Sequence, residues 1–346
     1  MHNDEVKKPI DIKAHQDNCF DFIRHIAALA VLVSHHFALT GRSEPYLFGG
    51  VKLGTAAVVV FFAISGYLIT KSFCRSSSIV SYFKKRMFRI FPALVVCSFF
   101  IVFFVCGLWG NKEILPWVLS VRSMESFLSF SLFVIPHNAE AINFFSNNYI
   151  YPNALNGSLW SLKFEFIDYV LVFVIFFFFR NKFKVIGGIS FLLGAIVVLW
   201  LNTKFNLSTY YLDRLALLSI PFATGSLLYT LENYWKQAKI KIYLMAIFFL
   251  VLIFIQAEDE YDIPLLIILS SFIIFLGFSF HDKLLSGKFD ISYGIYIYAF
   301  PVQQLIINEI TSDFFISIFI SVVLTLILAL FSWHFVEKKF IFNKRR

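Results

Sequence analysis

Long runs of apolar residues constrain this chain more than any other feature of its sequence. A helix needs about 17–25 mainly apolar residues to cross the hydrocarbon core of a bilayer. Ten stretches reach this length: 22–40, 51–70, 90–109, 158–180, 185–201, 212–231, 240–256, 263–280, 289–308 and 314–335. Their apolar residues are continuous rather than alternating, which is typical of helices and not of a β-barrel. The sequence therefore predicts an all-α polytopic membrane protein with about ten transmembrane helices.

The composition excludes a water-soluble fold. Apolar residues make up 59% of the 346 residues and charged residues only 15%, and 46 residues are Phe. An average soluble protein has about 25% charged residues, and a single core could not hide this much apolar surface. A phenylalanine-rich chain with four cysteines also fits neither a disordered chain nor a disulfide-rich secreted scaffold.

The distribution of Lys and Arg predicts the topology. If the N-terminus is cytoplasmic, 22 of the 30 Lys and Arg lie in cytoplasmic segments, six lie outside, and Arg24 and Lys163 lie inside spans. Positive charge accumulates on the cytoplasmic side of membrane proteins, so both termini are predicted to be cytoplasmic. We expect one membrane domain over 1–346, with a cytoplasmic N-terminal segment 1–18 and a basic tail 336–346.

The net charge of +8 follows from this topology. The basic loops are expected to face anionic lipid headgroups or a phosphate-bearing ligand, and no nucleic acid is expected as a partner because there is no folded basic domain. The external loop 110–157 is predicted to be the longest non-helical stretch. Within it, 127–135 is apolar but too short to span, which indicates a re-entrant or interfacial segment.

The first predicted helix carries an arginine and a histidine on one face. Arg24 and His35 are 11 residues apart, which places them within about 20° of each other and about 16 Å apart along the axis. Asp21 and Arg24 have the i,i+3 spacing of a helical salt bridge. Charges inside a membrane cost at least about 2.5–3.5 kcal/mol, which favours a functional role. The alternative is an arginine that reaches the cytoplasmic surface and a hydrogen-bonded core histidine.

A basic motif, KKRMFRIFP, follows the second predicted helix. Arg86 and Arg89 are i,i+3 on a predicted amphipathic helix, and Pro92 is predicted to open the next span. Two guanidinium groups at the cytoplasmic surface suit the recognition of phosphate. An ordinary basic loop is the alternative.

A carboxylate lies in the motif NGSLWSLKFEF, at the start of the fourth predicted span. Glu165 is expected one to two turns below the external surface, at the level of His35. The two side chains could form an acid/base pair, or the carboxylate could orient the imidazole. Alternatively, Glu165 pairs with Lys163 or is neutral and hydrogen-bonded.

The motif SYGIYIYAFPVQQ contains the tyrosines and glutamines of the ninth predicted span. Tyr293, Tyr296 and Gln303, with Pro301 between them, indicate a kinked polar helix that suits a cavity for a sugar. The tyrosines fit an aromatic belt at the membrane interface equally well.

These blocks, in this order, resemble acyltransferase family 3, bacterial inner-membrane enzymes that O-acylate cell-surface glycans. The resemblance runs from about 20 to 340 and rests on DFIRHIAALAVLVSHH, FFAISGYLIT, the Arg86–Arg89 pair followed by Pro92, SLWSLKFE, SYGIYIYAFP and FVEKKF. Ala299 stands where many relatives have a histidine, so no catalytic histidine is assigned there. The chain ends at Arg346 without the fused SGNH-type domain of some relatives, so the membrane domain, alone or with a separate partner, is expected to complete the transfer.

The resemblance implies an O-acetyltransferase of the bacterial inner membrane, with acetyl-CoA as donor and a lipid-linked surface glycan, such as O-antigen or exopolysaccharide, as acceptor. His35 would be the general base, and Glu165 would orient it or bind the acceptor. Arg24, Arg86 and Arg89 would hold the CoA phosphates. Tyr293, Tyr296 and Gln303 would contact the acceptor, and no metal is expected.

A transporter or flippase for a lipid-linked glycan or a small solute is the main alternative. It explains ten helices and intramembrane charges, but not the cytoplasmic arginine pair or the spacing of Arg24 and His35. A structural or assembly subunit has no use for the buried charges. The sequence leaves self-association, the acyl group and the acceptor sugar open.

Overall fold

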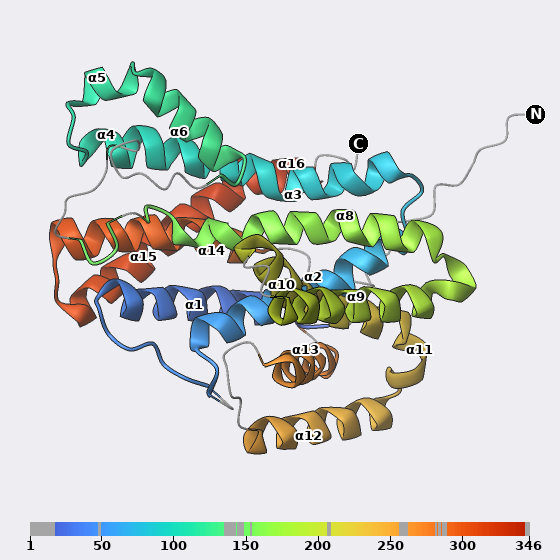
Figure 1. The fold of residues 1–346 in the computed structure, drawn as a ribbon. Helices are drawn as coiled ribbons and strands as arrows, with labels where there is room; N and C mark the ends of the chain where they lie inside the picture. The colour runs from blue at the N-terminus through green and yellow to red at the C-terminus, as the bar shows by residue number, and fades with distance from the viewer. Residues whose placement is uncertain are drawn as a thin grey trace, which may run out of the picture.

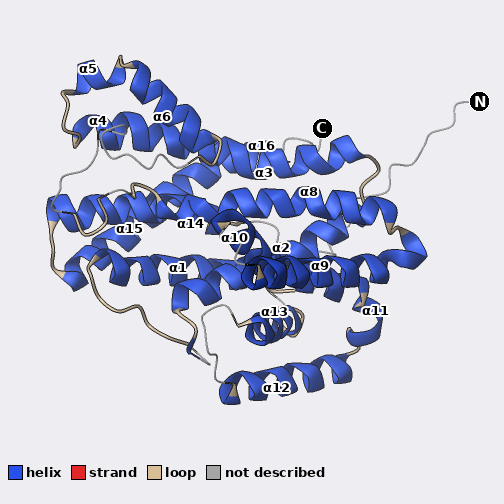
Figure 2. Cartoon of the chain, in the orientation of Figure 1, coloured by secondary structure: helices blue, strands red, loops and turns tan. Residues whose placement is uncertain are grey.

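The computed structural model describes residues 18–47, 50–134, 143, 149–152, 154–205, 209–255, 262–280, 282, 285 and 289–342. Over these residues the regular elements are all helical, as Figure 2 shows. The predicted cytoplasmic segment 1–18 lies almost entirely outside the described residues, as do the last four residues of the basic tail. The all-α prediction is confirmed for the described part of the chain.

Each of the ten predicted stretches falls on one long helix. The long helices are α1 (Phe20–Leu39), α2 (Leu53–Cys74), α3 (Ile79–Phe99), α8 (Leu162–Phe178), α9 (Lys184–Lys204), α10 (Tyr210–Thr230), α12 (Ala238–Phe254), α13 (Ile263–Gly277), α14 (Ser292–Leu305) and α15 (Phe314–Ser332). Shorter ones are α4 (Cys106–Leu108), α5 (Ile114–Val118), α6 (Val121–Ser131), α11 (Glu232–Trp235) and α16 (Lys338–Phe342). π-Helical turns extend α3, α14 and α15.

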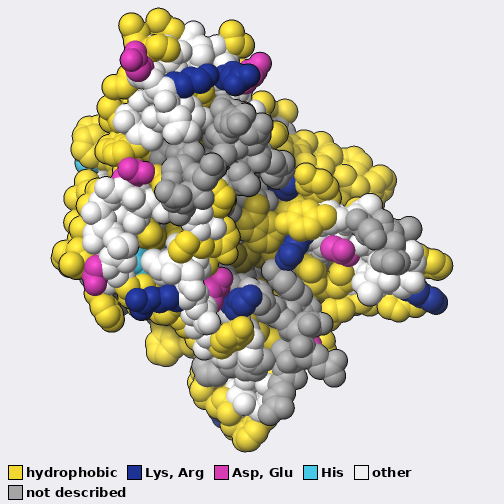
Figure 3. Space-filling view, turned by 60° about the vertical axis from the view of Figure 1, so that its left-hand side comes forward, with side chains coloured by type: hydrophobic (Ala, Val, Ile, Leu, Met, Phe, Trp, Pro, Cys, Tyr) yellow, Lys and Arg dark blue, Asp and Glu magenta, His cyan; other side chains and the backbone are white. Residues whose placement is uncertain are grey.

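Five helical segments of the described chain are long and apolar enough to cross a membrane. They are Phe20–Leu39, Leu53–Cys74, Ile79–Leu108, Asn181–Lys204 and Phe314–Ile341. Large apolar side chains also cover the outside of the molecule, as Figure 3 shows for one face. Phe178, Phe254 and Phe315 are each more than 70% exposed. A surface of this kind is suited to lipid rather than water, so the protein is a helical membrane protein; the number of crossings and their orientation stay predictions.

Helix α2 lies in the middle of the molecule, where it packs against α1, α8, α10 and α13 (Figure 1). Glycines permit the tightest of these contacts. A Cβ on Gly66 would lie 1.9 Å from the carbonyl oxygen of Phe222, and a Cβ on Gly225 would lie 2.0 Å from that of Ala63. Small residues at such positions let two membrane helices approach backbone to backbone.

The prediction that 110–157 is non-helical is wrong for its first part. Helices α5 and α6 occupy Ile114–Val118 and Val121–Ser131; α6 packs against α3, and α5 packs against α4 and α6 (Figure 1). Ser120 caps α6 by accepting a hydrogen bond from the Ser123 amide at 3.1 Å, and Phe130 is fully buried. Residues 127–131 of the apolar segment 127–135 are therefore the last residues of an amphipathic helix, in which Phe130 is buried and Leu128 is exposed.

Pro92 does not open a new helix, as the motif predicted, but lies inside α3. The basic segment and the apolar segment after it form one helix, which begins behind the cap residue Ser78. Arg86 and Arg89 therefore lie two to three turns inside α3 and are partly buried, instead of belonging to a surface loop.

Candidate functional site

A cavity of about 500 Å³ opens among α1, α2, α3, α8 and α14. Four basic side chains line it, together with three carboxylates and several aromatic rings. The basic residues are Arg24, Lys85, Arg86 and Arg89, and the carboxylates are Asp21, Glu165 and Asp290. We refer to it as the cationic cavity. The structure thus brings together the three predicted arginines from two helices.

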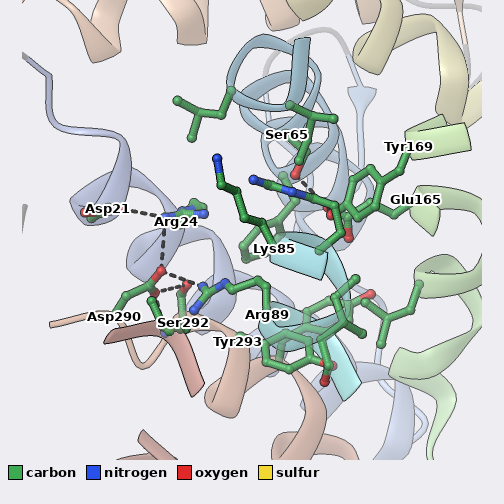
Figure 4. Close-up of a pocket in the computed structure, with 18 of the residues that line it drawn as sticks. Asp21, Arg24, Ser65, Lys85, Arg89, Glu165, Tyr169, Asp290, Ser292 and Tyr293 are labelled. Atoms are coloured by element: carbon green, nitrogen blue, oxygen red, sulfur yellow. Dashed lines mark hydrogen bonds and ion pairs between the residues drawn. The ribbon is translucent and has the colours of Figure 1, made fainter. Parts of the chain in front are cut away.

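On one wall of the cationic cavity, a single carboxylate joins two arginines (Figure 4). Asp290 Oδ2 accepts hydrogen bonds from Arg89 Nη2 at 2.6 Å and from Arg24 Nη2 at 3.0 Å. Its other oxygen accepts from the Ser292 hydroxyl at 2.5 Å and the Ser292 amide at 3.1 Å. Arg24 also forms the predicted pair with Asp21. The loop before α14 therefore holds α1 and α3 together through charge.

Arg89 also faces a second carboxylate, from the C-terminal end of the chain. Its Nη1 lies 3.6 Å from Glu337 Oε2, and Glu337 is buried and accepts a hydrogen bond from Ser332 at 3.0 Å. Buried charges of opposite sign compensate each other only at such short range. Two of the three predicted phosphate-binding arginines, Arg24 and Arg89, are thus held in position by carboxylates.

The opposite wall of the cationic cavity carries Glu165 (Figure 4). Its Oε1 accepts hydrogen bonds from Ser65 Oγ and from the Tyr169 hydroxyl, each at 2.6 Å. Lys163 lies over the Tyr211 ring at 4.2 Å instead of reaching the carboxylate. Arg86 donates to Ser72 Oγ at 3.1 Å.

A second, smaller cavity of about 200 Å³ contains His35. We refer to it as the histidine cavity; its other polar lining residues are Ser34, Glu44, Lys52, Thr55, Trp160 and Tyr296. Ser34 Oγ donates to Glu44 Oε2 at 2.5 Å. His35 packs edge-on against the Phe300 ring at 5.1 Å, and its Nδ1 is buried without a hydrogen-bond partner among the described residues. The imidazole is thus not committed to a structural hydrogen bond through Nδ1.

The structure does not place Glu165 at the level of His35. Ser34, next to His35, packs against Gly54 at the start of α2, where a Cβ would lie 2.6 Å from Ser34 Oγ. Glu165 instead bonds to Ser65, eleven residues or about 16 Å further along α2. The two predicted catalytic side chains therefore line different cavities.

The reason is the path of the motif NGSLWS. Asn156 is fully buried and donates from Nδ2 to the carbonyl oxygen of Ile297 at 2.8 Å, in the middle of α14. Ser158 is also fully buried, in the short 3₁₀ helix Gly157–Ser161 that precedes α8. Helix α8 consequently starts deep inside the protein, which moves Glu165 further from the predicted external surface than its sequence position indicates.

Two of the three predicted acceptor residues on α14 reach a cavity. Tyr293 lines the cationic cavity and donates its hydroxyl to the carbonyl oxygen of Ile90 at 3.0 Å. Tyr296 lines both cavities. Gln303 lines neither: it is fully buried and donates from Nε2 to the carbonyl oxygen of Leu32 at 2.8 Å. In this structure Gln303 holds α14 against α1.

Several residues that line the two cavities were not predicted from the sequence. Asp290 carried a usable signal, because it is a carboxylate at the edge of the predicted span 289–308 and the cost of burying it demands a cationic partner. Lys85 was visible only as one more charge of a basic motif. Glu44 gave no signal, because its approach to the histidine cavity depends on how the loop after α1 folds back onto the helices, and Trp160 was visible only as part of the motif NGSLWSLKFEF.

A cluster of cations beside a cavity with an imidazole whose Nδ1 has no hydrogen-bond partner among the described residues suits the binding of an anionic ligand next to a proton acceptor. The class follows from comparison with known proteins: the family model described as "Acyltransferase domain" matches residues 17–334. The chain therefore belongs to this family of acyltransferases, and the resemblance drawn from its motifs is confirmed.

The chain is also similar to two individual proteins. The chain is 35% identical over 345 residues to the O-acetyl transferase of Shigella phage Sf6, covering 94% of this chain and 97% of that protein. It is also 42% identical over 86 residues to nodulation protein 10 of Rhizobium leguminosarum bv. viciae, covering 24% and 23%. No solved structure matches the chain.

Proposed function

We propose that this acyltransferase is an O-acetyltransferase of the bacterial inner membrane that moves an acetyl group from cytoplasmic acetyl-CoA to a sugar hydroxyl of a lipid-linked surface polysaccharide, such as O-antigen or exopolysaccharide. The observation that carries the proposal is the pair of adjoining cavities, one lined by four cations and the other by His35. The similarity to a phage O-acetyl transferase over nearly the whole of both chains supports acetyl as the transferred group and an ester to oxygen as the bond formed.

The cationic cavity is the proposed site of the donor. CoA carries several phosphate charges, and forked guanidinium groups bind phosphate bidentately. Arg86 is the best placed for this role because, among the described residues, no carboxylate forms an ion pair with it: it donates to the Ser72 hydroxyl, and its buried Nε has no partner there. Arg24, Lys85 and Arg89 complete the cluster. Glu165, on the opposite wall, is proposed to contact the donor rather than to orient His35.

The histidine cavity is the proposed site of the acceptor. Its carboxylate Glu44 can accept hydrogen bonds from sugar hydroxyls, and the indole of Trp160 offers an apolar face to a sugar ring. His35 takes the proton of the attacking hydroxyl, and the hydroxyl oxygen bonds to the thioester carbonyl carbon. The carbon–sulfur bond then breaks, and the CoA thiolate recovers the proton from His35. A general base of this kind contributes about 10²–10⁴-fold in rate.

The test is transfer of label from acetyl-CoA into glycan, in membranes that contain the host's lipid-linked glycans. We expect His35→Ala to lower transfer by about 10²–10⁴-fold. We expect Arg86→Ala to raise the KM for acetyl-CoA by roughly 10–100-fold, since a charge-assisted hydrogen bond contributes about 1.5–3 kcal/mol. Arg122→Ala, at an exposed arginine of α6, is the matched control and leaves KM unchanged.

Full transfer by His35→Ala, at equal expression, would remove His35 from the mechanism. If wild-type membranes incorporate no label from any acyl-CoA but move lipid-linked glycan between the leaflets, the flippase alternative replaces the proposal. The comparison with Arg122→Ala separates a specific loss of donor binding from a general effect of removing a positive charge.

A further inference from the structure

We propose that Val58 and Tyr296 form a constriction between the two cavities that selects the acyl group by its size. The proposal rests on the proposed function, because it assigns the donor to the cationic cavity and the acceptor to the histidine cavity. Of the residues that line the two cavities, Val58 and Tyr296 are the ones that line both. They form the boundary that a transferred group meets on its way from one cavity to the other.

The order of residues along α2 supports this position for Val58. Gly54, four residues before Val58, lines the histidine cavity, and Ser65, seven residues after it, lines the cationic cavity. At 1.5 Å per residue, Val58 lies about 6 Å along the helix axis from Gly54 and about 10 Å from Ser65. It therefore occupies an intermediate depth between His35 and the cations.

Helix α14 gives the same order independently. Tyr293, three residues before Tyr296, lines the cationic cavity. Phe300, four residues after it, contacts the imidazole of His35 with the ring centroids 5.1 Å apart. Tyr296 thus lies, on a second helix, between the depth of the cations and the depth of His35. Val58 and Tyr296 therefore mark the same boundary between the two cavities.

Both side chains are held in place, so the opening between them has a fixed width. Tyr296 is 6% exposed; its hydroxyl is hydrogen-bonded to the Ser161 hydroxyl at 2.6 Å, and its ring meets Phe61 edge-on at 5.6 Å. Val58 is β-branched, and in a helix such a side chain keeps one rotamer in about nine cases of ten. A rigid opening discriminates by size, because widening it requires the helices themselves to move.

The chemistry requires a group to enter this opening. The thioester carbonyl carbon must meet the sugar hydroxyl that His35 deprotonates, while the CoA phosphates stay on the cations. The acyl chain, from the carbonyl carbon outward, therefore reaches or passes the boundary before the carbon–sulfur bond breaks and the carbon–oxygen bond forms. An acetyl group places one methyl beyond the carbonyl, and each added methylene has to fit against Val58 and Tyr296.

The experiment compares acetyl-, propionyl- and butyryl-CoA as donors, with kcat/KM measured for each in membranes of wild type and variants. Val58→Ala widens the opening. We expect it to raise the butyryl-to-acetyl ratio of kcat/KM by about tenfold, because a hydrophobic pocket usually discriminates by about this factor between substrates that differ by one or two methylenes. Val58→Ile narrows the opening and is expected to lower the propionyl-to-acetyl ratio. Val60→Ala makes the same truncation two residues along α2, at a buried side chain that lines neither cavity, and leaves both ratios unchanged.

The ratios separate selection from stability, because a poorly folded variant loses activity with all donors alike. If Val58→Ala and Val58→Ile leave the ratios at the wild-type values while acetyl transfer persists, the constriction does not select the acyl group and the proposed function still stands. If wild type transfers no acyl group from any of the donors, the proposed function fails and this inference fails with it. Equal shifts in Val60→Ala would also overturn it.

Discussion

Asp290 is the carboxylate on which two arginines of the cationic cavity converge. It accepts hydrogen bonds from Arg89 at 2.6 Å and from Arg24 at 3.0 Å, and both guanidinium groups lie largely out of contact with solvent. Without it, two positive charges from different helices would face each other across a poorly hydrated space, where like charges repel strongly. An anionic donor that binds at this point supplies further negative charge to the same two groups.

We therefore expect Asp290→Asn to lower the stability of the free protein and to increase the stabilisation that CoA provides. Leaving buried charges without their partner costs about 3–5 kcal/mol, and the phosphates of CoA can offset part of that loss in the variant. Thermal unfolding in detergent, with and without CoA, measures both effects. The rise in Tm on adding CoA should be larger for Asp290→Asn than for wild type.

The control for this prediction is an exposed carboxylate away from the cavity. Glu125 is an exposed residue of α6 that lines neither cavity, and charge interactions at the surface contribute at most about 1 kcal/mol to stability. Glu125→Gln should leave the Tm and its response to CoA close to the wild-type values. A response to CoA in Asp290→Asn no larger than in wild type would contradict binding of the phosphates at Arg24 and Arg89.

Residue positions within one helix were predictable, whereas contacts between distant segments were not. The spacing of Arg24 and His35 follows from helix geometry alone, and the structure keeps both on α1 facing cavities. The predicted pairing of His35 with Glu165 assumed that α8 begins at the membrane surface. That assumption failed because the polar residues before α8 are buried against α14, and hydropathy does not reveal such burial.

At the scale of the elements, α2 and α10 depend on two glycines for their close packing. A Cβ on Gly66 would lie 1.9 Å from the backbone oxygen of Phe222, which cannot move without displacing α10. We expect Gly66→Ala to lower the free energy of unfolding by about 1–3 kcal/mol, the usual cost of overpacking. The melting temperature in detergent should fall accordingly.

Gly194→Ala provides the matched control for this packing argument. Gly194 is inside α9, and a Cβ there would meet nothing within 4 Å. Since alanine favours a helix over glycine by about 0.8–1.0 kcal/mol, this variant should be as stable as wild type or more so. If Gly66→Ala and Gly194→Ala changed the melting temperature alike, contact between α2 and α10 would not be what Gly66 provides.

The positions of the long helices were predictable because the length and apolar character of a helix in a bilayer are local properties of the sequence. The residues at which these helices begin and end were less predictable. Pro92 marked a predicted boundary, yet α3 continues through it, since neighbouring helices can compensate for the hydrogen bond that a proline removes. Helices α5 and α6 escaped prediction because they are short and because the hydropathy pattern does not reveal what they pack on: α6 packs on α3, and α5 packs on α4 and α6.

At the scale of the whole molecule, the proposed reaction depends on which side of the membrane the cationic cavity opens to. The distribution of 22 Lys and Arg on one side and six on the other predicts that the loop 75–78, which leads into α3, is cytoplasmic and that α6 is external. Acyl-CoA is a charged cytoplasmic metabolite, so the arginines near the start of α3 must be reachable from that side. The proposed donor site is therefore possible only if the predicted topology is correct.

Two cysteine variants test this arrangement in intact cells, in a background with the exposed native Cys74 replaced by Ser. Ser77 and Arg122 are both exposed. A membrane-impermeant maleimide should label Arg122→Cys in intact cells but label Ser77→Cys only after the cells are opened. The reverse pattern would place the cationic cavity on the external side, out of reach of cytoplasmic acyl-CoA. Labelling of both positions in intact cells would put the loop before α3 and helix α6 after it on one side of the membrane and contradict the assignment of a span between them.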